Sequence, residues 1–180
     1  MNVVKYEAIT LSRDVEGLLI PAGSPIWLTQ GTNVQLTQAL GSSFTVFTDG
    51  QLVRLYGSDA DAISKEAPPI FQIPPGQSIS PELVVNALRG VFDPEIPVNI
   101  VDLGLLYDCH FETIESGLKI WIVMTLTAPA CGMGPILAQD VERIARQFNG
   151  VVDVHIDVVF DPPWSHDMMT SAAKLELGLL

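Results

Sequence analysis

The stretch 125–135 reads Thr-Leu-Thr-Ala-Pro-Ala-Cys-Gly-Met-Gly-Pro and sets a cysteine between two hydrophobic patterns. Before it, residues 118–127 alternate apolar and mixed side chains, which is the period of a half-buried strand. After it, the apolar residues of 136–148 fall on one side of a helical wheel. The chain is therefore expected to pass from strand to helix at Cys131, where unpaired N–H groups and the helix dipole favour a thiolate. Gly132 would let another group approach the backbone closely, so the sequence predicts an activated thiol.

A buried, inert cysteine is the alternative interpretation of Cys131, since free cysteines often lie in cores. Its neighbours are turn formers rather than core formers, and it stands at the start of a strand-helix-strand crossover, where ligands of such units bind. We therefore favour a functional thiol there. The other cysteine, Cys109, shares an apolar strand face with Tyr107 and Phe111, and packing accounts for it better.

Three carboxylates occupy the proline-pinned loop 93–104: Asp93, Glu95 and Asp102. They could be ordinary cap and turn residues, since Asp-Pro pairs commonly close helices. They could instead surround the thiol of Cys131. The local sequence leaves both possibilities open.

Three histidines are candidate ligands or bases. His110 and His155 are expected on a polar strand face with several carboxylates, and the spacing lacks the tight pattern of a zinc site. A solvated face is the simpler explanation for both. His166, in the expected first turn of the last helix, is a weak candidate base or ligand.

The segment Asp161-Pro162-Pro163-Trp164 is a stiff strand exit with a large aromatic residue at its end. Trp164 could cover the edge of the core. It could also contact a partner or form a wall of the thiol pocket.

Composition narrows the class of protein. The 180-residue chain is 48% hydrophobic and carries a net charge of -12, so a nucleic-acid backbone would be repelled. No apolar run approaches the ~18 to 20 residues that span a bilayer, and the N-terminus lacks the layout of a signal peptide. We expect a cytoplasmic protein that binds neither nucleic acid nor membrane. Two cysteines are too few for a disulfide framework or a four-thiolate metal site in one chain.

Turn signals and alternating patterns divide the chain into three parts. Residues 1–57 read as a small antiparallel β domain of six short strands, and the Asp-Gly pair at 49–50 is a strong hairpin signal. Residues 58–79 are rich in proline and aspartate and read as a linker. Residues 1–57 contain no recognisable set of catalytic residues. The expected strands are 3–11, 17–20, 25–29, 33–40, 44–47 and 52–56.

Residues 80–180 are expected to form a second domain with the order α-β-β-α-β-α. Ser80 is a good N-cap for a helix starting at Pro81, and Ser165 is the expected cap of the last helix. A hairpin followed by a right-handed crossover gives a three-stranded mixed sheet. Helices would cover its apolar face, so the chain is predicted to be an α+β protein.

Four motifs follow one another along the chain: Asp93-Pro94-Glu95, Asp102-Leu103-Gly104, Thr127-Ala128-Pro129-Ala130-Cys131 and Asp161-Pro162-Pro163-Trp164. In this order and at these separations they resemble the iron-sulfur cluster assembly domain family, which includes the PaaD-like proteins and the eukaryotic CIA-targeting factors. The resemblance covers about residues 80 to 180. Two N-terminal segments, Ile20-Pro21-Ala22-Gly23 and 36–41, look like the longer bacterial SufT type.

The resemblance implies a factor that helps to deliver or insert iron-sulfur clusters into client proteins. Cys131 matches the family's reactive cysteine and could be a transient cluster ligand, with no other cofactor implied. Asp93, Glu95 and Asp102 match the family's acidic positions. Many relatives have proline directly after the cysteine, whereas this chain has Gly132, which makes the loop more flexible and restores an N–H donor. Thr127 and Trp164 belong to the matching motifs and are supporting residues.

The expected partners are the assembly machinery and client apoproteins, and two copies facing through Cys131 could share a cluster as a homodimer. An assembly factor of this kind would have no turnover reaction of its own. Two other functions stay open. One is a thiol enzyme for acyl or thiol transfer, with Cys131 as nucleophile and His166 or a carboxylate as base. The other is a protein adaptor that binds through the Trp164 edge and an acidic face.

Overall fold

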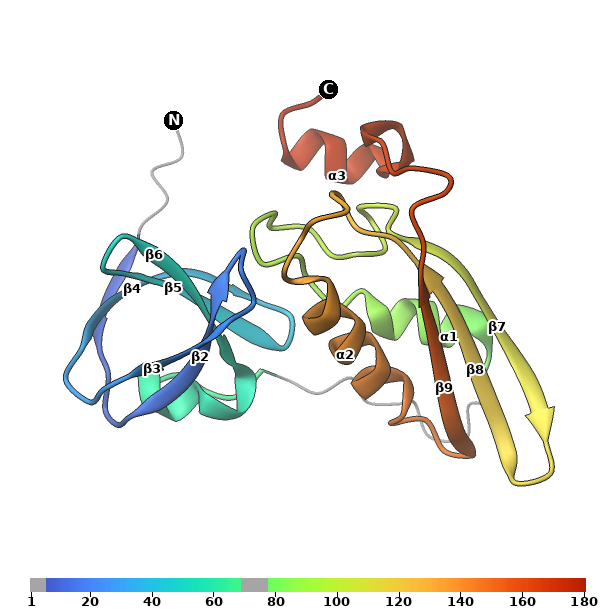
Figure 1. The fold of residues 1–180 in the computed structure, drawn as a ribbon, viewed down its shortest axis with the longest axis horizontal. Coiled ribbons are helices and arrows are strands. Elements are labelled where there is room, and N and C mark those ends of the chain that lie inside the picture. Colours follow the sequence, from blue (N-terminus) through green and yellow to red (C-terminus); the bar gives the residue numbers. More distant parts are fainter. Residues whose placement is uncertain (1–5, 69–77) are drawn as a thin grey trace. The chain divides into compact units, whose positions relative to one another are not determined.

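A computed structural model describes residues 6–68 and 78–180 of the chain (Figure 1). The chain divides into two compact units. The first contains an antiparallel sheet of six strands, and the second combines helices with a three-stranded mixed sheet. The predicted α+β class is therefore confirmed. No helix within the described residues is long and apolar enough to cross a membrane.

The first unit follows the predicted pattern of short strands separated by turns. Its sheet has the order β1-β4-β5-β6-β2-β3. Asp49 and Gly50, between β5 and β6, have φ angles of 50° and 79°, the left-handed backbone that a tight hairpin turn requires. The part of the predicted first strand before residue 6 lies outside the described residues. The strands are β1 (Glu7–Thr10), β2 (Val15–Ile20), β3 (Pro25–Leu28), β4 (Asn33–Leu40), β5 (Ser43–Thr48) and β6 (Gln51–Tyr56).

A 3-10 helix, η1 (Gly57–Ile63), follows β6 and completes the core of this unit. The composition of the sequence predicts a linker over residues 58–79. The packed unit extends into this range, because part of η1 is buried against the strands. Residues 69–77 of the predicted linker lie outside the described residues. The buried η1 residues are Ala60, Ala62 and Ile63.

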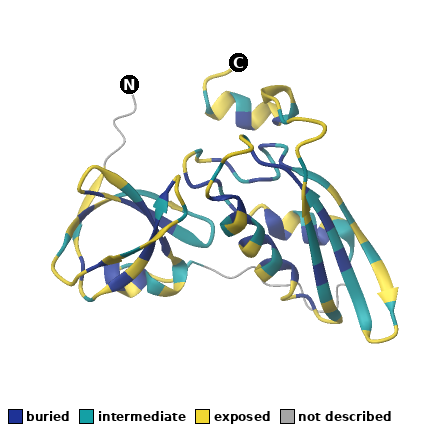
Figure 2. Cartoon of the chain, in the orientation of Figure 1, coloured by how far each residue is buried: buried dark blue, intermediate teal, exposed yellow. Residues whose placement is uncertain are grey.

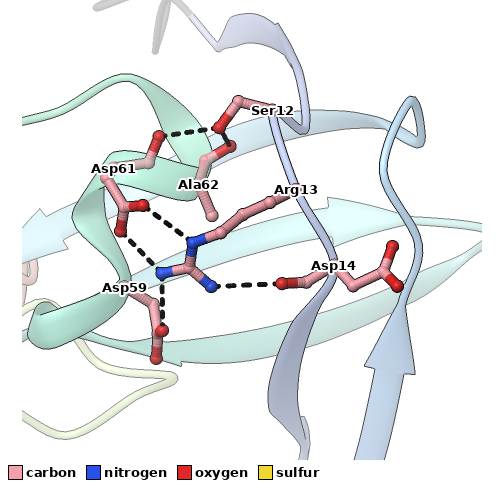
Figure 3. A network of polar contacts seen from close by, with 6 residues as sticks. All are labelled: Ser12, Arg13, Asp14, Asp59, Asp61 and Ala62. Carbon is pink, nitrogen blue, oxygen red and sulfur yellow. Dashed lines mark hydrogen bonds and ion pairs between the residues drawn. The ribbon is translucent and has the colours of Figure 1, made fainter.

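Arg13, in the turn before β2, joins η1 through a network of hydrogen bonds and ion pairs (Figure 3). Its guanidinium donates to both carboxylate oxygens of Asp61, at 2.7 and 2.6 Å, and to Asp59 at 2.9 Å. The Ser12 hydroxyl donates to the Asp61 carbonyl at 2.9 Å. The hydrogen bonds from Arg13 hold the pKa of Asp61 below its usual value. The network therefore ties η1 to the start of β2.

The second unit has the predicted order of elements. Its sheet has the order β7-β8-β9, with β8 antiparallel to β7 and parallel to β9, so the predicted mixed sheet is confirmed. The Ser80 hydroxyl accepts a hydrogen bond from Leu83 N–H at 3.2 Å and caps the first helix, as expected. The elements are α1 (Pro81–Leu88), β7 (Leu106–Ile114), β8 (Gly117–Met124), α2 (Gly134–Ala145), β9 (Val151–Val158), η2 (His166–Met168) and α3 (Ser171–Glu176).

One face of this sheet is covered by helices and the other is open. Alternate residues of β8, which are Ile120, Ile122 and Met124, are fully buried, whereas the residues between them are only partly buried (Figure 2). α1 contacts β7, α2 contacts β9, and the two helices contact each other. The hydrophobic face therefore lies under α1 and α2, as the alternation predicts.

The last helix begins later than predicted. Ser165 precedes the short 3-10 turn η2 and makes no side-chain capping bond, so its predicted role as the cap of the last helix is wrong. The Thr170 hydroxyl instead accepts a hydrogen bond from Ala173 N–H at 3.2 Å, and α3 starts at Ser171. The segment before α3 is bound to the loop that contains Asp102, because Thr170 N–H donates to the Asp102 carbonyl at 2.9 Å.

Replacing Asp61 by Asn should lower the free energy of unfolding of the first unit at neutral pH, because the ion pair with Arg13 is lost. The pKa of Asp61 is lowered in the folded state, so its contribution is complete above the ordinary pKa of an aspartate. This contribution to stability disappears as the pH falls from the ordinary pKa of an aspartate through the lower pKa that Asp61 has in the folded state. Urea unfolding followed by the NMR signal of the Trp27 indole N–H, at pH 7 and below pH 4, measures both effects. Asp49→Asn is the control, since Asn tolerates the same turn, and an equal loss in both variants would contradict the prediction.

Candidate functional site

Three segments with predicted site residues meet at one end of the three-stranded sheet. Because β7 is antiparallel to β8 and β9 is parallel to it, β7 begins where β8 and β9 end. Thr125 N–H donates to the Leu105 carbonyl at 2.8 Å, and Val159 N–H donates to the Met124 carbonyl at 2.9 Å. We call this the site end of the sheet. The segments that start or finish there are 99–105, 125–133 and 159–168 (Figure 1).

Cys131 lies in a tight loop at the site end. Its N–H donates to the Ala128 carbonyl at 3.3 Å, and its carbonyl accepts from Gly134 N–H at 3.1 Å. Met133 is fully buried and anchors the loop, whereas Gly132 is exposed. The thiol is half-buried, and none of the described residues hydrogen-bonds to its Sγ. The loop thus presents a partly accessible sulfur on a backbone held at both sides.

The predicted switch from strand to helix at Cys131 is wrong. α2 begins at Gly134, with Met133 at the position before it. A Cβ at Gly134 would press on the side chain of Leu126, so the glycine lets the first turn of α2 lie close to the end of β8. Cys131 therefore lies before the helix rather than in its first turn.

Two threonines lie on the segment between β8 and Cys131. Thr127 is half-buried between β8 and Cys131. Thr125 is fully buried, and its hydroxyl has no hydrogen-bond partner among the described residues. A buried unpaired hydroxyl costs roughly 1–3 kcal/mol, so Thr125 is an unusual residue that the sequence analysis does not single out.

The two cysteines differ in environment. Cys109 lies on β7 and is half-buried. Burial raises its pKa to about 11, with further contributions from the negative charges of Asp108 and Glu82. A thiol with this pKa is almost entirely protonated at neutral pH and is a poor nucleophile.

Asp102 holds its own loop in place. Arg89 Nη1 donates to one of its carboxylate oxygens, and Asn99 Nδ2 donates to the other, both at 2.6 Å. The Asn99 side-chain oxygen in turn accepts from Val101 N–H and Asp102 N–H, which is an Asx turn. Partial burial raises the pKa of Asp102, but hydrogen bonds from Arg89, Asn99 and Thr170 outweigh it, so the pKa lies below its usual value. This carboxylate is thus ionised and fixes the loop against the end of α1.

Asp93 and Glu95 have different surroundings. Asp93 is buried at 5% exposure, and its N–H donates to the Val98 carbonyl at 3.2 Å. Phe92 and Asn99 form an isolated bridge that closes the same loop. Glu95 is exposed. The geometry thus makes Asp93 part of the loop's interior and leaves Glu95 toward solvent.

Trp164 locks the segment after β9 to the Asp102-Leu103-Gly104 loop. Its indole N–H donates to the Leu103 carbonyl at 2.8 Å. The Tyr107 hydroxyl donates to the Pro162 carbonyl at 2.7 Å. Gly104 has a φ of 74°, and a Cβ there would collide with the Met168 carbonyl. Two of the predicted motifs are therefore packed against each other.

The histidines lie in two places. His110 and His155 project from the open sheet face on either side of Trp121. His166 is the first residue of η2, and its ring lies 5.1 Å from the Trp164 ring. No group of three or more His, Cys, Asp or Glu side chains within the described residues could hold a metal ion.

Iodoacetamide should modify Cys131 well before Cys109 at pH 8, because the alkylating species is the thiolate. With a pKa of about 11 for Cys109, roughly one molecule in a thousand carries the thiolate there at that pH. Mass spectrometry of proteolytic peptides over time measures both sites. Labelling of Cys109 should become fast only as the pH approaches its pKa, and equal rates at pH 8 would refute this contrast.

Replacing Gly104 by Ala should destabilise the second unit strongly. The left-handed backbone alone costs an alanine roughly 1–2 kcal/mol, and the collision with Met168 adds to it. Gly178→Ala is the matched control, since Gly178 has a φ of 69° and open space around its Cβ position. Urea unfolding followed by the NMR signal of the Trp164 indole N–H should show a larger loss for Gly104→Ala. Equal losses would mean that the contact with η2 contributes nothing.

Comparison with known proteins assigns the second unit. Residues 81–158 match the family described as "Iron-sulfur cluster assembly protein". A "Fe-S protein maturation auxiliary factor" from Porphyromonas gingivalis is 44% identical, over 55% of this chain and 91% of the relative. The "Fe-S protein maturation auxiliary factor YitW" from Bacillus subtilis is 40% identical, over 54% and 93%. The "Fe-S protein maturation auxiliary factor SufT" from Staphylococcus aureus is 36% identical, over 49% and 98%.

These relatives are matched along nearly their whole length, and the match takes up about half of this chain. The family match covers α1 through β9, which includes the Asp102 loop and the Cys131 loop. Three of the four motifs identified from the sequence lie within this match, and Asp161-Pro162-Pro163-Trp164 follows it. The chain belongs to the iron-sulfur cluster assembly family of the SufT type.

Proposed function

We propose that this chain assists the maturation of iron-sulfur proteins and that Cys131 makes the transient contact with the cluster being delivered. The observation that carries the proposal is the placement of the thiol. Cys131 is partly accessible, lies on a loop anchored by Met133, and has no hydrogen-bond partner for its Sγ among the described residues. The names of the relatives, which are maturation auxiliary factors, support the same function.

The chemistry of a lone thiol suits handover better than storage. When Sγ of Cys131 binds an iron atom of the cluster, the thiol proton goes to solvent, and no electron is transferred. Clusters in proteins are usually held by four cysteine thiolates, so the other bonds must come from a donor, a client or a second copy of this chain. Release then requires that a single iron–sulfur bond to this protein is exchanged.

The surrounding residues have a positioning role in this proposal. Asp102 fixes the 99–105 loop through Arg89 and Asn99, and Trp164 fixes the segment after β9 to Leu103. Both segments share the site end with the Cys131 loop. They therefore fix two segments that share one end of the sheet with the Cys131 loop, whose residues 128–130 are exposed.

The site geometry gives less support to a thiol enzyme. Such an enzyme needs a base within hydrogen-bond reach of the nucleophile. His166 lies against Trp164 instead, and Asp102 is bound by Arg89 and Asn99. A maturation factor requires no such base.

The expected partners are the assembly machinery and client apoproteins, and we place the protein in the cytoplasm with them. A homodimer that shares a cluster between two copies of Cys131 is one arrangement that would complete the ligand set.

Anaerobic reconstitution with iron and sulfide tests whether Cys131 binds a cluster. A cluster held by Cys131 should be lost in Cys131→Ser, and its retention in that variant would exclude the thiol as a ligand.

In a strain that lacks the gene for this protein, wild-type protein should restore the activity of cluster-dependent enzymes and Cys131→Ser should not. Cys109→Ser is the matched control, because it removes the half-buried thiol with the raised pKa. We expect Cys109→Ser to restore activity to about the wild-type level. Full restoration by Cys131→Ala would refute the thiol mechanism and favour an adaptor.

A further inference from the structure

The open face of the three-stranded sheet carries a regular grid of side chains, three from each strand. The strand register sets them in three rows across β7, β8 and β9. We call this grid the open sheet face. Its rows are Asp108, Val123 and Asp157; His110, Trp121 and His155; and Glu112, Lys119 and Asp153.

The middle row is aromatic. The ring of His110 is stacked on Trp121 with centroids 6.3 Å apart, and the ring of His155 is tilted against it at 4.3 Å. The Trp121 indole N–H donates to Glu112 at 2.8 Å. These contacts hold three planar rings side by side across the sheet.

Carboxylates occupy the four corners of the grid. Asp108 is hydrogen-bonded to His110 at 2.6 Å, and Asp157 is hydrogen-bonded to His155 at 2.9 Å. The side chains of Asp108 and Asp157 are 56% and 50% exposed. Lys119 is the only fixed cation of the grid and is paired with Asp153 at 3.1 Å. Arg146 Nη2 also lies 3.8 Å from Asp153, at the margin of the grid. Carboxylates therefore outnumber the fixed cations on this face.

Lys119 shows how a cation is held on this face. Its Nζ lies 4.3 Å from the centroid of the Trp121 ring while it pairs with Asp153. An aromatic face beside a carboxylate is a favourable position for a cation. The same combination of ring and carboxylate recurs on the other side of the row, where His155 lies beside Asp157.

We propose that the open sheet face binds a basic segment of a partner protein, with arginine side chains lying on the aromatic row and paired with the corner carboxylates. Charge complementarity selects this partner, since a second copy of the chain would bring the same negative charge to the face. Arginine suits the site because its planar guanidinium both stacks on rings and pairs with carboxylates. The proposal does not depend on the role of Cys131.

The test is a titration of the 180-residue chain, labelled with nitrogen-15, with a short peptide of alternating arginine and serine. Heteronuclear NMR monitors the titration. The indole N–H signal of Trp121 and the amide signals of the open sheet face should shift. A peptide of alternating lysine and serine should bind several-fold more weakly, because lysine lacks the planar group. A peptide of alternating glutamate and serine should not bind.

Asp108→Asn combined with Asp157→Asn should weaken binding of the arginine peptide about tenfold, if each lost pair is of the usual strength for an exposed ion pair. Asn keeps the shape of the side chain and an acceptor for the histidine. The control is Glu66→Gln combined with Glu176→Gln, two exposed positions with the same change in net charge. Binding to the control pair should equal that of the wild type.

Three outcomes would overturn the proposal. An equal loss in both double variants would show a general attraction to an acidic protein. Equal affinity for the arginine and lysine peptides, or no shift of the Trp121 signal, would remove the aromatic row from recognition. A wild-type dimer in sedimentation equilibrium that is lost only in the Asp108/Asp157 variant would make the face a contact between copies of this chain.

Discussion

The pairing of strand ends at the site end of the sheet is the constraint on which the second unit depends. The bonds from Thr125 to Leu105 and from Val159 to Met124 carry the ladder past the regular strands. Three loops therefore emerge from the same end of the sheet. A mixed sheet makes this possible, because a parallel neighbour finishes, and an antiparallel neighbour starts, at the same edge. Trp164 then fastens two of these loops to each other.

This arrangement separates the thiol of Cys131 from the groups that hold the neighbouring loops. Asp102 is ionised and fully engaged with Arg89 and Asn99, so it stabilises a loop rather than serving as a free base. Cys131 lies on a loop whose fixed points are backbone bonds and a buried methionine. The two thiols differ in place rather than in degree of burial: Cys109 lies within β7, where burial raises its pKa, whereas Cys131 lies in a loop before α2, which begins at Gly134.

Much of this fold could be predicted from the sequence because its strands alternate sharply and its turns contain Gly, Pro and Asp. The mixed sheet followed from the order of the elements alone. Helix starts were harder to predict. α2 begins at Gly134 because Met133 enters the core first, and α3 is capped by Thr170 because the preceding segment is tied to Asp102. η1 resembled a linker in composition, although its small apolar residues fill the core of the first unit.

The contacts between loops could not be predicted, since they depend on tertiary placement. The sequence contains Arg89 and Asp102, but nothing in their spacing says that they pair. The same holds for Trp164 and the Leu103 carbonyl. The open sheet face is different. The alternation of polar and apolar residues along its strands predicts a solvated surface. The strand register adds that Trp121 lies between His110 and His155.

The two proposals together resolve a difficulty of handover by a single thiol. One iron–sulfur bond is easily exchanged, and for that reason it cannot by itself choose the correct recipient. The row of the open sheet face formed by Asp108, Val123 and Asp157 is the row nearest to the site end, where β8 leads into the Cys131 loop. A basic segment that lies along the face would therefore reach the site end of the sheet, from which the Cys131 loop emerges. Recognition would come from the many weak contacts of the face, and Cys131 would supply only the bond that is exchanged.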